Sequence, residues 1–113
     1  MHELSLAHEV IQILAQEAER HRIARIVRYR LEVGLLRGVV PELLRSGLEL
    51  AARGTVAEGA AIELLEVQGL ARCHSCGHEF PIPDLLILCP SCERVGGDLL
   101  AGSELRVIEL EGD

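Results

Sequence analysis

The sequence Cys73-His74-Ser75-Cys76 is followed, after twelve further residues, by Cys89-Pro90-Ser91-Cys92. Each stretch is a C-x-x-C pair, and the two pairs contain all four cysteines of the chain. Two residues between the cysteines let both thiolates of a pair bind one ion, and four thiolates suit a tetrahedral Zn²⁺ in a closed site. Because such a site has no open coordination position, we expect this zinc to stabilise the fold rather than to take part in catalysis.

Three alternatives to zinc follow from the same cysteines. They could form two disulfides, remain four unrelated thiols, or hold an iron ion with four thiolate ligands. Paired C-x-x-C motifs at this spacing favour zinc over disulfides or free thiols. Because every cysteine fits one metal site, the sequence also indicates a reducing compartment, and we expect a cytoplasmic protein.

Composition excludes several classes of partner. The 113-residue chain has a net charge of −7, and residues 54–113 carry three arginines against eleven acidic side chains. An acidic second half disfavours binding to nucleic acid or to an anionic membrane surface. No apolar run approaches membrane-spanning length, and polar residues at Glu3, Ser5 and His8 argue against a signal peptide.

The periodicity of apolar residues predicts two helices and three strands. The helices are expected at 4–19 and 41–53, the first with Leu6, Ala7, Val10, Ile11, Leu14 and Ala18 on its buried face. The strands are expected at 26–33, 60–67 and 103–110, the first with Val27, Tyr29, Leu31 and Val33 facing inward.

The order of these segments predicts an α+β fold. A strand at 103–110 needs partners, and the other two expected strands precede the cysteines. We therefore expect a small sheet of about three strands covered by two helices, with an inserted four-cysteine lobe that is similar to a zinc ribbon. The expected domains are residues 1–67 plus 103–113, and residues 68–102, with hinges near Gly69 and Gly102.

The amino terminus reads Met1-His2-Glu3, which is a candidate chelate. Met1 should be retained because His is not a small second residue. The terminal amine, the His2 backbone nitrogen and the His2 imidazole can then close two fused rings, with a Glu3 nitrogen or carboxylate completing the plane. Deprotonated amide nitrogens suit square-planar Ni(II) or Cu(II) rather than Zn²⁺. The alternative is a frayed terminus without a ligand role.

The remaining histidines have simpler expected roles. We expect His8 and His21 to be solvated on or near the first helix. His74 and His78 flank the first zinc knuckle, the turn formed by the Cys73–Cys76 pair. There they are either exposed or support the zinc ligands. A sharper hypothesis is that one of them replaces a thiolate when pH falls or nickel binds. The carboxylates form no convincing acid/base pair, so we interpret the protein as a non-enzyme.

Several stretches resemble the hydrogenase maturation nickel metallochaperones, the HypA/HybF family. They cover the whole chain at matching spacing: Met-His-Glu-Leu-Ser-Leu at 1–6, Leu-Glu-Val-Gly at 31–34, Val-Pro-Glu-Leu-Leu at 40–44, Arg-Gly-Thr-Val-Ala-Glu-Gly-Ala at 53–60, the segment from Cys73 to Cys92, and Gly-Ser-Glu-Leu at 102–105. One departure is Glu93, where many zinc knuckles have glycine.

The resemblance implies nickel at His2 and Glu3 and structural zinc at Cys73, Cys76, Cys89 and Cys92. It also implies a partner GTPase and delivery of Ni(II) to the precursor of the [NiFe]-hydrogenase large subunit, with urease maturation as a possible second destination. The alternative function is a zinc-ribbon interaction adaptor that transports no metal.

Overall fold

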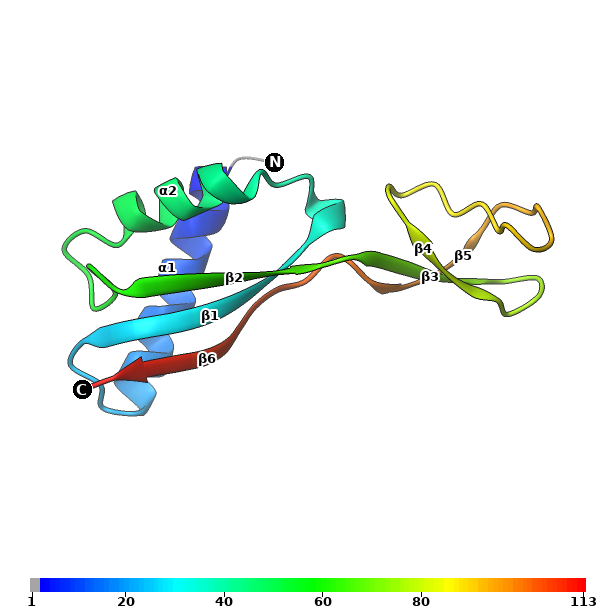
Figure 1. The fold of residues 1–113 in the computed structure, drawn as a ribbon. Coiled ribbons are helices and arrows are strands. Elements are labelled where there is room, and N and C mark those ends of the chain that lie inside the picture. The colour runs from blue at the N-terminus through cyan, green and yellow to red at the C-terminus, as the bar shows by residue number, and fades with distance from the viewer. Residues whose placement is uncertain (1–2) are drawn as a thin grey trace. The chain divides into compact units, whose positions relative to one another are not determined.

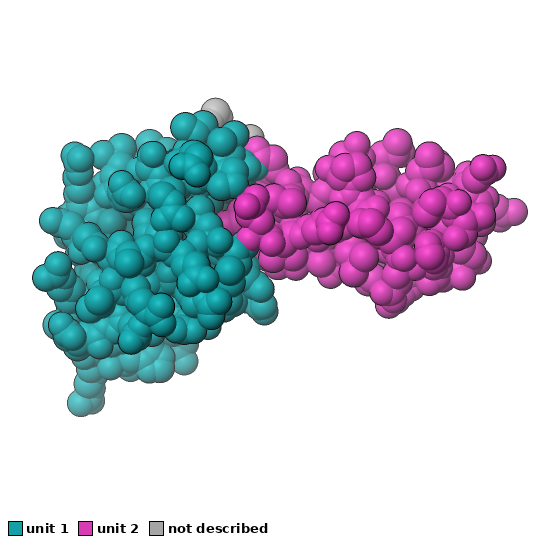
Figure 2. All heavy atoms as spheres, viewed as in Figure 1, with its two compact units in different colours: residues 1–32, 39–65, 105–113 teal, residues 33–38, 66–104 magenta. Residues whose placement is uncertain are grey.

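The computed structural model describes residues 3–113, which form two compact units (Figure 2). Unit 1 contains the described residues up to 32, together with 39–65 and 105–113, and unit 2 contains 33–38 and 66–104. The elements are α1 (Glu3–Arg20), β1 (Ile26–Gly34), the 3-10 helix η1 (Leu35–Arg37), α2 (Pro41–Ala51), β2 (Ala61–Val67), β3 (Gly69–Cys73), β4 (Glu79–Ile82), β5 (Gly97–Ala101) and β6 (Leu105–Gly112) (Figure 1).

Unit 1 is a three-stranded sheet with two helices. The strand order is β2-β1-β6, and β1 and β2 run in the same direction in Figure 1 while β6 runs opposite to them. Backbone hydrogen bonds between Ala24 and Asp113 at one end and between Gly34 and Glu104 at the other confirm that β1 and β6 are antiparallel. The expected α+β fold, with its three-stranded sheet and two helices, is therefore confirmed.

Helix α1 has the buried face that its sequence predicts. All six apolar residues expected on that face are buried: Leu6, Ala7, Val10, Ile11, Leu14 and Ala18. They recur every three or four residues, so burying one stripe of the helix removes all of them from water. Helix α2 packs against this helix, and Gly47 lies at the contact, where a Cβ would be in van der Waals contact with the Ala7 Cβ at 3.4 Å.

Strand β1 departs from the expected alternation at its first residues. Tyr29, Leu31 and Val33 are buried as expected, but Val27 is 51% exposed and Ile26 is fully buried in its place. The Ile26 N–H donates to the Val56 carbonyl at 2.9 Å, which ties this end of the strand to the segment before β2. The inward alternation therefore starts only after Val27, and our prediction for that residue was wrong.

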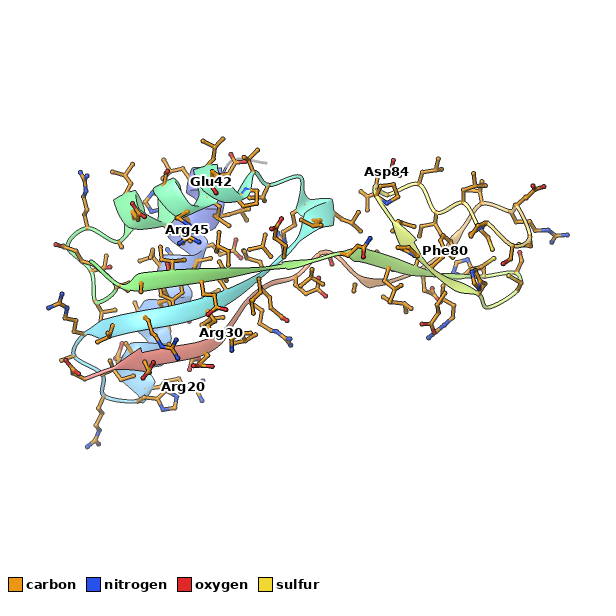
Figure 3. All side chains as sticks on the ribbon, viewed as in Figure 1. Arg20, Arg30, Glu42, Arg45, Phe80 and Asp84 are labelled. Atoms are coloured by element: carbon orange, nitrogen blue, oxygen red, sulfur yellow. The ribbon has the colours of Figure 1, made fainter. Side chains whose placement is uncertain are left out.

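The polar face of the sheet is lined by ion pairs. Arg28 lies 2.9 Å from Glu109, and Arg106 lies 2.6 Å from Glu32. Arg30, labelled in Figure 3, lies 3.2 Å from Glu63 on β2. Exposed pairs of this kind contribute little stability individually, because water screens the charges and ordering two long side chains costs entropy. They nevertheless match charges across all three strands, as expected for the solvated face of a half-buried sheet.

Helix α2 begins at Pro41, as predicted, but it ends two residues earlier than expected. Its last helical residue is Ala51, and Ala52 is the C-terminal cap. Gly54 has a positive φ of 75°, and it lies in the turn beyond the cap. There its N–H donates to the Glu58 carboxylate at 2.6 Å. The glycine is therefore required by this turn rather than by the helix end itself.

Unit 2 contains a second sheet, in the order β4-β3-β5. Both pairings are antiparallel, with Gly69 opposite Ile82 and Cys73 opposite Gly97. Its small core consists of Ala71, Cys73, Phe80, Ile82 and Cys89, with Leu36, Ile87 and Cys92 packed against it. Because two of these five core residues are cysteines, packing in unit 2 depends on the state of the sulfur atoms.

Glycines at 34, 69 and 102 let three backbone segments of unit 2 meet. A Cβ on Gly34 would overlap the Gly102 carbonyl oxygen, and one on Gly102 would lie 2.6 Å from the Gly69 Cα. Gly102 also has a φ of +115°. Leu36, from η1, donates its N–H to the Gly102 carbonyl at 2.9 Å. Close packing therefore accounts for the glycines that we expected to act as hinges.

Within residues 3–113, neither α1 nor α2 combines the length and the apolar character needed to cross a bilayer.

Candidate metal centre

The four cysteines of unit 2 converge on one point. Their Sγ atoms all lie within 4.8 Å of one another, and no other metal-binding side chain of the described residues joins the group. The Cys73 and Cys92 sulfurs are 3.5 Å apart, and those of Cys76 and Cys89 are 3.6 Å apart. Tetrahedral zinc with sulfur ligands at about 2.3 Å requires sulfur–sulfur distances of roughly 3.8 Å.

These distances exclude two of the states considered for the cysteines, disulfides and unrelated thiols. A disulfide requires about 2.05 Å between sulfurs, and all four cysteines are free thiols in the structure. Four unrelated thiols would not converge. The expected metal-binding cluster at Cys73, Cys76, Cys89 and Cys92 is therefore present, and its donor set and spacing fit a single tetrahedral ion.

The two knuckles have the same backbone geometry. Gly77 donates its N–H to the Cys73 carbonyl at 3.0 Å, and Glu93 donates its N–H to the Cys89 carbonyl at 2.9 Å. The φ angles at these two positions are +76° and +62°. The turn after each C-x-x-C pair therefore needs a left-handed residue, which glycine supplies without strain and Glu93 adopts at a cost. The departure noted at Glu93 changes the residue but not the turn.

Backbone amides and neighbouring sulfurs act in opposite directions on the thiols. The Cys76 N–H lowers the pKa of the Cys73 thiol to about 6, assisted by the Ser75 N–H at 3.3 Å. At Cys92 the Arg94 N–H favours the thiolate, but burial and the adjacent sulfurs outweigh it and raise the pKa to about 11. The thiolate form of Cys73 is thus stabilised, and the negative charge on one sulfur opposes the ionisation of its neighbour Cys92. A cation among the four sulfurs removes this repulsion.

The two histidines beside the first knuckle have other partners. His74 Nε2 lies 3.0 Å from an Asp98 carboxylate oxygen, and both side chains are exposed. His78 stacks on Phe80 with ring centroids 5.9 Å apart. Neither imidazole belongs to the group of metal-binding atoms formed by the described residues. His8 and His21 are exposed, as expected.

The candidate nickel residues lie at the start of the chain. Met1 and His2 fall outside the described residues. Glu3 is the first residue of α1 and is half-buried. Its Oε2 accepts a hydrogen bond from the Val40 N–H at 3.1 Å. Val40 caps the N-terminus of α2 without a side-chain hydrogen bond of its own. Sequence reasoning missed this contact, because no local pattern relates residue 3 to residue 40.

The fold and the cysteine cluster define a class: small two-unit proteins with a helix-covered sheet and a four-cysteine metal-binding lobe. A family model described as "Hydrogenase/urease nickel incorporation, metallochaperone, hypA" matches residues 1–112. The chain therefore belongs to the HypA family, as its resemblance had suggested. This is a family of maturation factors rather than of enzymes.

Curated relatives agree with this assignment, and a solved structure has the same fold. A protein of Geobacter sulfurreducens named hydrogenase maturation factor HypA is 41% identical over 111 residues, covering 98% of both chains. One of Alkalilimnicola ehrlichii with the same name is 37% identical over 113 residues, covering all of both chains. The solution structure of the Ni metallochaperone HypA from Helicobacter pylori has a TM-score of 0.75 at 23% identity, covering 99% of this chain and 97% of that one.

Proposed function

We propose that this protein is a nickel metallochaperone that supplies Ni(II) for the maturation of [NiFe]-hydrogenase. The observation that carries this proposal is the family match, which spans residues 1–112 and includes the Met-His-Glu amino terminus. In this proposal, nickel binds to the Met1 amine, the His2 backbone and imidazole nitrogens, and Glu3. Nitrogen donors in one plane favour Ni(II) and give Zn²⁺ no advantage.

The contacts of Glu3 support a nickel site at this position. The hydrogen bond to Val40 ties the first residue of α1 to the start of α2. A ligand residue that the fold already holds in place loses less entropy when it binds an ion. Because few protein ligands hold the cargo, a recipient protein can remove it.

Zinc is proposed as the resident ion of the four-cysteine cluster. The cluster offers four soft thiolate donors at tetrahedral spacing, which leaves no position for a substrate. The ion would hold together a unit whose core has only five buried residues. Its role is therefore structural, and the transported ion binds elsewhere.

The proposed partners follow from the family. They are a maturation GTPase and the precursor of the [NiFe]-hydrogenase large subunit, and urease maturation proteins form a second possible set. The family description names both hydrogenase and urease. We place the protein in the cytoplasm, where a reducing environment keeps thiols available for metal.

An adaptor without transported metal is the competing function. The exposed apolar side chains of unit 2 favour it: Leu85 is 71% exposed, Leu86 60% and Val95 70%. Such side chains often mark docking surfaces. The adaptor predicts that one zinc ion binds and that the amino terminus has no ligand role.

Nickel titration of the untagged, zinc-loaded protein separates the two functions. We expect one Ni(II) per chain in the parent protein and loss of that site in His2→Ala. His8→Ala is the matched control, since it removes an exposed imidazole from α1. A short N-terminal extension should also abolish binding because it removes the free α-amine. Equal nickel stoichiometry in the parent and in His2→Ala would favour the adaptor.

A further inference from the structure

Helix α2 has apolar side chains on two of its sides, and one of these sides is exposed. Leu44, Gly47 and Leu48 are its buried residues. Leu43 and Leu50 lie on a different side of the helix, and both are half-exposed. Seven residues are almost two full turns, so these two leucines lie above one another, roughly 10 Å apart along the axis. A surface helix typically has one apolar stripe and a polar opposite face, so a second apolar stripe indicates a further contact.

The neighbours of Gly47 extend the exposed stripe onto α1. A Cβ at Gly47 would lie 3.6 Å from the Glu3 carbonyl oxygen and 3.7 Å from the Leu4 Cα. Val40 lies at the same place, because its N–H donates to the Glu3 carboxylate at 3.1 Å. The resulting apolar surface, which we call the helix-pair patch, has four members that are each between 45% and 55% exposed: Leu4, Val40, Leu43 and Leu50. Large apolar side chains that gather on one exposed surface mark interaction sites.

The helix-pair patch is continuous with the proposed nickel site. Leu4 follows Glu3 in the chain, and Val40 is hydrogen-bonded to the Glu3 side chain. In the proposed function, nickel is held by residues 1–3 and has to pass to ligands of another protein. Transfer requires the incoming ligands to be positioned close to the ion. The recipient must therefore cover the surface beside Glu3, which is where the patch lies.

Carboxylates border the patch on α2. Glu42 and Glu49 each precede a leucine of the patch, so they lie about 100° around the helix axis from it. Both are exposed, and neither forms an ion pair within residues 3–113. Arg45, the only basic residue of α2, points toward β2 and donates to the Ile62 carbonyl at 2.7 Å (Figure 3). A second copy of the chain would bring like charges together at this border, whereas a basic partner would complement it.

We propose that the helix-pair patch is the docking surface for the protein that receives nickel from the amino terminus, and that this recipient presents large apolar side chains flanked by lysine or arginine. The apolar side chains pack against Leu43 and Leu50, and the basic groups pair with Glu42 and Glu49. Burial of the apolar cluster supplies affinity, while charge pairing at the border speeds association. This inference rests on the proposed nickel function, because that function requires a recipient.

Binding and nickel transfer can be measured with the untagged, zinc-loaded chain and the purified large-subunit precursor of [NiFe]-hydrogenase from the same organism. Leu43→Gln and Leu50→Gln replace each leucine by a polar residue that also favours helix. We expect each to raise the dissociation constant for the precursor about ten-fold and to slow nickel transfer below saturation by a similar factor. Nickel stoichiometry should stay at the parent value, because residues 1–3 are unchanged. Urea unfolding checks that each variant is folded.

Val27→Gln is the matched control for the leucine variants. Val27 is also half-exposed, but it lies on β1 rather than on the helix pair. Its substitution should leave binding to the precursor unchanged.

Neutralising the acidic border tests the charge requirement. Glu42→Gln should slow association with the precursor about two-fold at low ionic strength, and the difference should disappear in high salt, where exposed charges are screened. Glu19→Gln makes the same change at an exposed carboxylate near the other end of α1 and should leave the association rate unchanged.

Unchanged binding in both leucine variants, or an equal loss in Val27→Gln, would overturn the proposal. It would also be overturned if the leucine variants lost binding only to the maturation GTPase, or if the parent formed a dimer that Leu50→Gln dissociates, because the patch would then have another occupant. A parent chain that holds no nickel would instead contradict the metallochaperone function. Binding of the nickel-free chain to the precursor tests the patch separately from that function.

Discussion

Glu3 and Val40 are 37 residues apart in sequence, yet the Glu3 Oε2 accepts the Val40 N–H at 3.1 Å. This contact joins the first residue of α1 to the cap of α2. A carboxylate at a helix N-terminus also interacts favourably with the helix dipole. One side chain therefore connects the helix pair with the proposed nickel-binding end of the chain.

Removing the Glu3 carboxylate should destabilise the protein. We expect Glu3→Ala to lower the free energy of unfolding by about 1 kcal/mol, since it removes a hydrogen bond and a favourable charge. Glu3→Gln should lose less, because its amide oxygen can still accept the Val40 N–H. Urea unfolding measures both changes. Glu9→Ala, an exposed position on α1, is the control, and an equal loss in that variant would argue against a role for the contact.

The two knuckle turns should respond in opposite ways to substitution. Gly77→Ala introduces a side chain at a φ of +76° with no atom within 4 Å of the new Cβ, so its cost is backbone strain of about 1–2 kcal/mol. Glu93→Gly relieves similar strain at +62° but gives the unfolded chain about 0.5–1 kcal/mol more entropy. We expect it to be neutral or slightly stabilising.

Denaturant unfolding of the zinc-loaded protein checks this pair. A loss in Glu93→Gly as large as that in Gly77→Ala would show that the Glu93 side chain, rather than the backbone angle, matters at this position.

Tyr29 should make the folded protein sensitive to alkali. Because burial raises the pKa of its phenol, the folded state keeps the proton at pH values where the unfolded chain has lost it. The contribution to stability is complete below the unfolded pKa of about 10 and is lost as pH rises toward the folded pKa. Phenolate absorbance should therefore appear at higher pH in the native protein than in guanidinium chloride. Coincident titration curves would mean that the phenol is solvated.

Removing the metal should affect unit 2 before unit 1. Cys73 and Cys89 form part of a five-residue core, and the four sulfurs repel one another when ionised without a cation. We expect a strong chelator to accelerate hydrogen exchange across residues 66–104 while the α1 amides stay protected. Readdition of zinc should restore protection. Uniform loss across both units would show that they unfold together.

The sequence was sufficient for the features that depend on local spacing. The buried stripe of α1 follows from a 3.6-residue repeat, and the two C-x-x-C pairs predict a metal-binding cluster because ligand spacing is itself local. The three strands of unit 1 were expected at nearly correct positions. Family membership was also evident from motifs distributed along the whole chain.

Tertiary structure alone decided the features that depend on contacts between distant segments. The short strands of unit 2 were not expected individually, because five residues such as 69–73 give too few repeats to reveal an alternation. The exposure of Val27 depends on a bond from Ile26 to Val56, and the pocket beside Tyr29 depends on small residues of the connection between α2 and β2, such as Ala57 and Gly59, meeting β1 across the fold. Periodicity reports which side of an element is buried, but only packing determines what it is buried against.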